Sequence, residues 1–167
     1  RRELEVFVQG FGVVLAAFIP ATLVTTMFLH GSWSHVIGNM WYLWIFGDNV
    51  EDRMGHGRFI AFYLLCGFVA AIGQIMLDPG STVPMIGASG AIAGVMGAYF
   101  VLYPQSRVLT LIPFIIFFDI VELPAILLLG FWFVMQLFSA GAVAVTASST
   151  SGGVAFMAHV AGFVMGL

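Results

Sequence analysis

The sequence predicts an all-α, polytopic bundle of transmembrane helices. Of its 167 residues, 61% are hydrophobic and only 8% are charged, and the mean hydropathy is +1.08. A soluble domain carries about 25% charged residues, so this composition excludes a soluble enzyme. The net charge of −3 argues against a nucleic-acid partner. The apolar stretches lack the alternation of apolar and polar residues that membrane β-strands show, which leaves helices.

Four apolar segments are interpreted as membrane spans, because a helix needs about 20 mostly apolar residues to cross the bilayer. They cover roughly residues 34–46 (with the apolar residues before them), 59–76, 85–103 and 123–138. A fifth, from about 154 to 167, is expected to be a helix cut within its length. Polar or turn-forming runs separate them, at 47–58, 77–82, 104–107 and 146–153.

Two segments do not fit a simple span. Residues 108–118 are apolar but too short, so we expect them to lie at the membrane interface, with Asp119 and Glu122 near the headgroups. Residues 6–29 are apolar overall but contain many polar and helix-weakening residues. By composition alone, they suit a transmembrane helix and an interfacial segment equally well.

The arginines indicate the direction of the spans. Arg53 and Arg58 lie in the first loop and Arg107 lies in the third, whereas the second and fourth loops contain no Arg or Lys. Basic residues favour the cytoplasmic side. The first and third loops are therefore predicted to be cytoplasmic, and the second and fourth to face outward.

This topology predicts that polar residues of three helices share one depth. His35 and Asn39, then Ser89, then His159 each fall roughly 6–10 Å below the outer surface, at 1.5 Å of rise per residue. Nucleophilic catalysis requires a hydroxyl within reach of a base, together with donors for the developing oxyanion. The sequence supplies these groups at one level, so it predicts a site for acyl transfer.

Small residues allow the helices that carry this site to approach closely. His159, Gly162 and Gly166 share a helix face, and small residues also repeat at intervals of four along the helix after Ser89. That ladder consists of Gly90, Gly94 and Ala98. The segment from Gly87 to Gly90 is predicted to open this helix, where free backbone N–H groups favour an oxyanion. His35 and Asn39 are four residues apart and share a face.

The set resembles the rhomboid family of intramembrane serine proteases. The motifs that carry the resemblance are His35-xxx-Asn39, Gly87-Ala88-Ser89-Gly90 and Ala158-His159-xx-Gly162-xxx-Gly166. Phe28-Leu29-His30-Gly31 precedes the first motif, and Gly47-Asp48-Asn49-Val50-Glu51 follows its span. The resemblance covers nearly the whole chain.

The resemblance implies a role for each matching residue. Ser89 would be the nucleophile and His159 the base, a dyad with no third acid. Asn39, His35 and the Ser89 backbone N–H would form the oxyanion hole. The residues that would support the site are Gly87, Gly90, His30 and Gly162, with Glu51 as a structural acid at the cytoplasmic end. No metal or other cofactor is implied.

The family also implies the architecture and the partners. Its core has six helices, so the chain would be one domain over residues 1–167, lacking the first helix and cut within the last. Residues 1–29 would be an outward loop or interfacial segment, and 30–167 the transmembrane core. The substrates would be transmembrane proteins within the lipid bilayer. The expected location is a bacterial-type inner membrane, with the site opening to the outer face.

Other functions remain as alternatives. The first is a catalytically silent relative that binds membrane proteins or acts in their quality control. A small transporter or channel would usually show paired repeats or broken helices, which the sequence does not. A zinc protease of the membrane would be expected to carry His-Glu-x-x-His, which does not occur here. Aspartyl cleavage is disfavoured because Asp48, Asp119 and Glu122 all fall at the cytoplasmic side.

Overall fold

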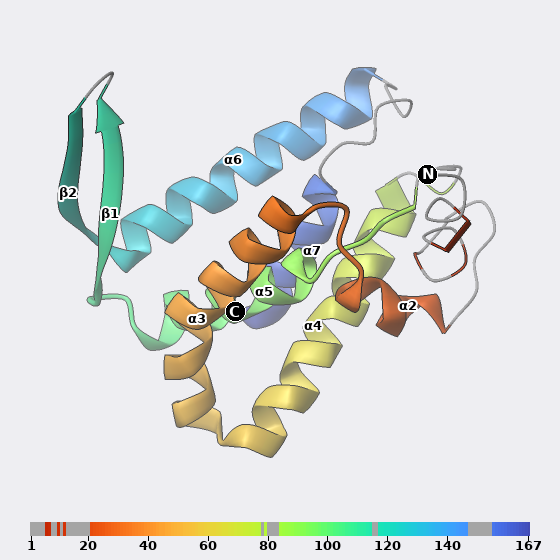
Figure 1. The fold of residues 1–167 in the computed structure, drawn as a ribbon, viewed down its shortest axis with the longest axis horizontal. Helices are drawn as coiled ribbons and strands as arrows, with labels where there is room; N and C mark the ends of the chain where they lie inside the picture. The colour runs from red at the N-terminus through yellow and green to blue at the C-terminus, as the bar shows by residue number, and fades with distance from the viewer. Residues whose placement is uncertain are drawn as a thin grey trace.

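The computed structural model describes residues 6, 7, 10, 12, 21–77, 79, 84–114, 117–146 and 155–167, and this part of the chain is mostly helical (Figure 1). Its elements are, in order, α2 (Thr22–Thr25), the 3-10 helix η2 (Thr26–Phe28), α3 (Trp33–Met54), α4 (His56–Leu77), α5 (Ser89–Leu102), β1 (Arg107–Phe114), β2 (Phe117–Pro124), α6 (Ala125–Thr146) and α7 (Phe156–Gly166). The predicted helical bundle is confirmed, with one β-hairpin added to it.

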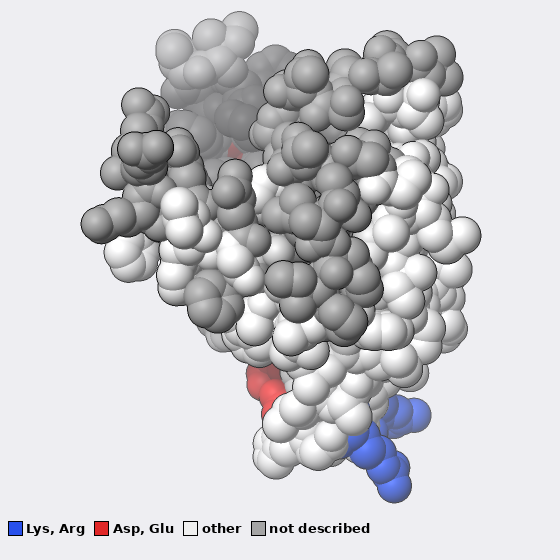
Figure 2. Space-filling view, turned by 90° about the vertical axis from the view of Figure 1, so that its right-hand side faces the viewer, with Lys and Arg blue, Asp and Glu red and all other residues white. Residues whose placement is uncertain are grey.

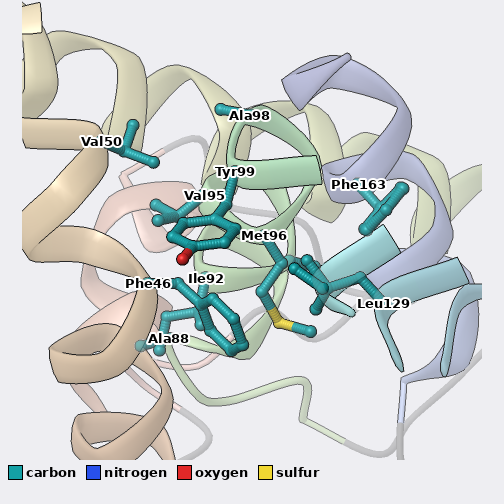
Figure 3. Packing of buried hydrophobic residues seen from close by; sticks show 12 residues of the cluster. Phe46, Val50, Ala88, Ile92, Val95, Met96, Ala98, Tyr99, Leu129 and Phe163 are labelled. Carbon is teal, nitrogen blue, oxygen red and sulfur yellow. The ribbon is translucent and has the colours of Figure 1, made fainter. Parts of the chain in front are cut away.

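Helix α5 lies at the centre of the bundle. Every residue from Gly90 to Tyr99 is buried, and α5 contacts α3, α4, α6 and α7. Figure 3 shows Phe46 of α3 beside Tyr99, with the two rings in an edge-to-face contact at 5.0 Å between centroids. Leu129 of α6 and Phe163 of α7 belong to the same buried cluster. Because α5 is enclosed on all sides, small residues around its circumference let four elements approach it.

The closest approach is between α5 and α7, and it is made by glycine backbones. A Cβ atom added to Gly162 would lie 2.0 Å from the carbonyl oxygen of Gly90. A Cβ atom on Gly166 would lie at the same distance from the carbonyl oxygen of Gly94. The two backbones are therefore in direct contact, as the small-residue pattern predicted. We call these four residues the glycine seam.

Helix α3 is longer than predicted. It continues through residues 47–53, which the polar composition had indicated to be a loop, and it ends only at Gly55, whose φ is +83°. Polar residues can remain helical once the chain has left the hydrocarbon, so polarity marked the membrane boundary and not the helix end. Gly55 donates its N–H to Glu51, and Glu51 also contacts His56 at 2.6 Å across the turn.

The starts and ends of three other helices also differ from the prediction. Helix α4 begins at His56 and α6 extends to Thr146, so both are longer than their apolar stretches. Helix α5 is shorter, because residues 84–88 are not helical and Ser89 is its first residue. Apolar composition therefore predicted where these helices lie in the sequence but not their first and last residues.

Residues 107–114 and 117–124 pair as two antiparallel strands, which the sequence analysis did not predict. Leu111 lies opposite Ile120 and Thr110 opposite Val121. Both strands are rich in β-branched and large apolar residues, which favour strands. The sequence analysis used only the length of this apolar segment, which is too short for a membrane span. Arg107 and Glu122 form an ion pair of 3.7 Å across the hairpin. In Figure 1 the hairpin stands beside the start of α6, away from the other helices.

Among the described residues, two helices are long and apolar enough to cross a membrane, by length and composition: His56–Leu77 and Ala125–Ala144. Only 22% and 11% of their most apolar windows are buried inside the protein, so most of each surface faces outward. The Arg side chains visible in Figure 2 lie at the lower end, where α3 meets α4 in Figure 1. In the segment 6–29, whose placement composition alone left open, residues 22–28 form α2 and η2, whereas residues 8, 9, 11 and 13–20 lie outside the described residues.

Candidate active site

Ser89 and His159 meet at the end of the glycine seam formed by Gly90 and Gly162. The Ser89 hydroxyl Oγ lies 2.8 Å from Nε2 of the His159 imidazole, which is hydrogen-bonding distance. Ser89 is the first residue of α5 and His159 is the fourth of α7. Gly90 and Gly162 of the seam each lie within three residues of this pair, so backbone packing sets its separation.

The local fold of residues 84–88 places Ser89 at a helix start. Gly87 has a φ of +119°, which strongly favours glycine, and its N–H donates to the carbonyl of Thr26 at 2.9 Å. The Thr26 hydroxyl in turn donates to the carbonyl of Met85. This anchored loop turns the chain into α5. The Ser89 backbone N–H therefore belongs to the first helical turn, whose N–H groups have no intrahelical acceptor.

Helix α3 presents His35 and Asn39 to the same place. The helix begins after Ser32, whose hydroxyl accepts the His35 N–H at 3.2 Å. A Cβ atom on Gly87 would lie 2.8 Å from the His35 ring, so the loop fits against the imidazole only as glycine. Asn39 is 7% exposed, and its amide Nδ2 has no hydrogen-bond partner among the described residues. A buried donor without a partner is costly, and in a native protein it calls for an explanation.

These side chains line one cavity of about 580 Å³. Its wall includes Ser89, His159, His35 and Asn39, and its remainder consists mainly of small and apolar residues. Those contributed by other elements include Thr26, Met27, Gly67, Ala70, Ala71, Met85, Ile86 and Ala155. The volume and the apolar wall with a few polar groups are typical of a ligand site.

Sequence reasoning missed two contacts of His159 and one of its neighbour Ala158. Gln136 of α6 places Oε1 2.8 Å from Nδ1 of the imidazole, and the Trp132 ring lies 5.7 Å from it between centroids. Gln74 of α4 accepts the N–H of Ala158, the residue before His159, at 3.3 Å. A signal for Gln136 was present, because it is a polar residue near the outer end of an apolar span. The depth argument applied to the other site residues would have found it.

Of the remaining predicted residues, His30 lies beside the candidate site and Glu51 lies far from it. The His30 ring packs edge-on against His35 at 5.1 Å between centroids, and its Nε2 is buried without a hydrogen-bond partner among the described residues. Glu51 lies near the opposite end of α3, where it contacts His56. The structure thus brings together Ser89, His159, His35, Asn39 and Gly87, with His30 beside them and Glu51 apart.

Comparison with known proteins gives consistent matches. The model of the Rhomboid domain matches residues 20–167. The chain is 40% identical over 76 residues to Rhomboid protease GluP of Bacillus subtilis, covering 46% of this chain and 14% of that protein. It is 34% identical over 89 residues to the human mitochondrial presenilin-associated rhomboid-like protein, covering 51% and 23%. It is 38% identical over 76 residues to the mitochondrial RHOMBOID-like protein 6 of Arabidopsis thaliana, covering 46% and 24%. The chain thus matches less than a quarter of the length of each of these relatives.

Proposed function

Since this chain belongs to the rhomboid family, we propose that it is a serine endopeptidase that cleaves transmembrane or juxtamembrane segments of membrane proteins. The observation that carries the proposal is the 2.8 Å contact between Ser89 Oγ and His159 Nε2 at the wall of a cavity. A hydroxyl is a weak nucleophile until a base within hydrogen-bond reach takes its proton. The protease name of the Bacillus relative supports the same reading.

In the first step, the Ser89 hydroxyl donates its proton to Nε2 of His159 while Oγ attacks a peptide carbonyl carbon of the substrate. The C–O bond forms as the carbonyl π electrons move to oxygen, which becomes an oxyanion. The proton held by His159 then passes to the leaving amine nitrogen as the C–N bond breaks. An acyl-enzyme remains on Ser89, and a water activated by the same imidazole hydrolyses it.

Three donors are placed to stabilise the oxyanion. The Ser89 backbone N–H lies in the first turn of α5, where the helix dipole is positive. The Asn39 amide Nδ2 is buried at the cavity wall without a protein partner among the described residues, as a donor reserved for substrate would be. The His35 ring lines the same cavity and would add a third N–H. Preorganised donors of this kind stabilise the transition state without reorganising during the reaction.

The chemistry restricts the substrate. A transmembrane helix satisfies its own backbone hydrogen bonds, so it must unwind locally before a carbonyl can reach Ser89. Substrates should therefore carry helix-weakening residues near the cleaved bond. The hydrolytic step needs water, so the cavity should open to the outer face of the membrane. The membrane that we propose is a bacterial-type inner membrane.

The direct test is covalent labelling by a fluorophosphonate probe, with the full-length natural protein in lipid nanodiscs. The wild type should be labelled, and Ser89→Ala should not be, because Oγ is the atom that forms the bond to phosphorus. Ser106→Ala, which changes a serine in the turn after α5, should label like the wild type. Equal labelling of Ser89→Ala would refute the assignment of the nucleophile. A folded wild type that resists the probe would favour the catalytically silent alternative.

Asn39 gives a second prediction. Asn39→Ala should lower kcat for a transmembrane substrate by roughly 10²–10³-fold, the usual effect of removing one oxyanion donor. Thermal stability should be unchanged or higher, because the variant removes a buried amide that lacks a partner among the described residues.

The matched control for this prediction is Asn49→Ala, ten residues farther along α3, whose amide donates to the Ile45 carbonyl at 3.4 Å. It should leave kcat unchanged. If Asn39→Ala retained wild-type turnover, or lost activity only through unfolding, Asn39 would not be an oxyanion donor.

A further inference from the structure

Both ring nitrogens of His159 are within hydrogen-bonding distance of a protein side chain. Nε2 lies 2.8 Å from Ser89 Oγ, and Nδ1 lies 2.8 Å from Oε1 of Gln136. We propose that Gln136 is a positioning residue, whose side-chain oxygen fixes the tautomer and the orientation of the His159 imidazole. The inference rests on the proposed function, because it assigns a partner to the base of that reaction.

The argument begins with the hydrogens. A neutral imidazole has one N–H group and one nitrogen lone pair, and an amide oxygen can only accept. With Oε1 facing Nδ1, the hydrogen must be on Nδ1, which leaves the lone pair on Nε2 directed at the Ser89 hydroxyl. The opposite tautomer would place N–H against Oγ, and the ring could not then take the serine proton. The group on the second nitrogen therefore decides whether the pair can react.

A second contact from the same helix fixes the plane of the ring. Trp132 lies four residues before Gln136 on α6, so both side chains emerge from one face of that helix. The Trp132 ring lies 5.7 Å from the imidazole, tilted by 37°. Gln136 thus holds one edge of the imidazole while Trp132 lies against its face, and α6 supplies both contacts.

An amide suits this place better than a carboxylate does. Most of α6 faces outward, since only 11% of its most apolar window is buried, and an acid within a membrane span is costly. When His159 holds the serine proton, both of its nitrogens carry hydrogen, and Nδ1–H can remain bonded to Oε1. Oε1 of Gln136 can thus accept a hydrogen bond from Nδ1–H throughout the reaction. Unlike a carboxylate, it adds no negative charge to the span.

Gln74 provides a contrast. It also contacts the segment around His159, but it accepts a backbone N–H from Ala158 at the start of α7 and does not bond to the imidazole. Its role is to hold the helix terminus. Replacing it should lower stability without changing the tautomer of His159, so the two glutamines separate a positioning role from a structural one.

The test compares Gln136→Met, Gln136→Glu and the matched Gln105→Met in the full-length protein in nanodiscs. Methionine keeps the length of the side chain but removes the amide, so the fluorophosphonate labelling rate should fall roughly tenfold, the loss of one ordinary hydrogen bond. KM for a transmembrane peptide should stay at the wild-type value, and the thermal midpoint should fall by only a few degrees, because the buried Nδ1–H loses its acceptor. Gln105, which is exposed in the turn after α5, should tolerate methionine with no change in rate.

Gln136→Glu restores an acceptor oxygen and so should recover most of the labelling rate. As an anion beside Nδ1 it should also favour the protonated ring, which moves the acid limb of the pH–rate profile to higher pH. The side chains around His159 come from four helices. They are Ser89 of α5, His35 of α3 across the cavity, Gln136 and Trp132 of α6, and Gln74 of α4 near the start of α7. A change in packing alone would leave the pH profile in place.

The imidazole ¹⁵N shifts of His159 provide a readout independent of activity. The wild type should show hydrogen on Nδ1, and Gln136→Met should show a mixture of tautomers or hydrogen on Nε2. The proposal would be overturned if the probe labelled Gln136→Met at the wild-type rate, or if the ¹⁵N signature of His159 did not change in this variant. If the wild type itself resists the probe, the proposed function fails, and the ¹⁵N signature still decides the role of Gln136.

Discussion

His159→Ala is expected to lower kcat/KM for a transmembrane substrate by roughly 10⁴-fold or more, the range seen when the base of a serine hydrolase is removed. Without the imidazole, Ser89 Oγ has no hydrogen-bonded base among the described residues that could take its proton at neutral pH. The nearest other titratable side chain at the cavity is His35, which lies on α3 and is proposed to face the oxyanion. The residual rate should come from the oxyanion donors alone.

Cleavage of a fluorogenic transmembrane peptide in nanodiscs measures this effect, with His56→Ala as the matched control. His56 is an exposed histidine at the first position of α4, far along the chain from the site, and its side chain contacts Glu51. The control should retain wild-type kcat/KM. Turnover by His159→Ala within tenfold of the wild type, in protein shown to be folded, would remove His159 from the mechanism.

Gly162→Ala is expected to abolish most of the activity and to lower the thermal midpoint by several degrees. The added methyl carbon would lie 2.0 Å from the Gly90 carbonyl oxygen, and a backbone atom cannot swing aside as a side chain can. Overpacking of this kind typically costs about 1–3 kcal/mol. Gly90 follows Ser89 directly, so relief of the clash moves the nucleophile away from His159. We expect a loss of at least about 10²-fold in kcat, since a displacement of about 1 Å can have that effect.

Gly141→Ala on α6 is the matched control, because a Cβ atom there would meet nothing within 4 Å. It should keep full activity and a wild-type or slightly higher midpoint, since alanine is the better helix former. The informative measurements are cleavage rate and thermal unfolding on the same samples. A Gly162→Ala protein with wild-type values for both would contradict the close contact of the two backbones.

Much of the bundle and of the candidate site could be predicted because each rests on a pattern with a physical cause. Apolar length predicts spans, and arginine placement predicts their direction. Together these two patterns predict that Ser89, His159 and Asn39 share one depth. The stripe of His159, Gly162 and Gly166 predicted a close helix contact, because small residues at this spacing leave room for another backbone.

The remaining features depend on contacts between distant parts of the chain. The hairpin was missed because the length of residues 108–118 was weighed and their β propensity was not. The start of α5 at Ser89 depends on hydrogen bonds from η2 to residues 85 and 87, which no local pattern encodes. Gln136 was not predicted because the sequence argument sought a nucleophile, a base and oxyanion donors. A glutamine amide that orients the base belongs to none of these groups.

The glycine seam has a consequence for how the molecule responds to its surroundings. Since peptide groups of α5 and α7 touch without any rotatable side chain between them, no change of rotamer within the seam can move the backbone of Ser89 away from the backbone of His159. Exchange of the surrounding lipids or substitution of outward-facing residues should therefore change how often a substrate arrives more than it changes the rate of bond cleavage after arrival.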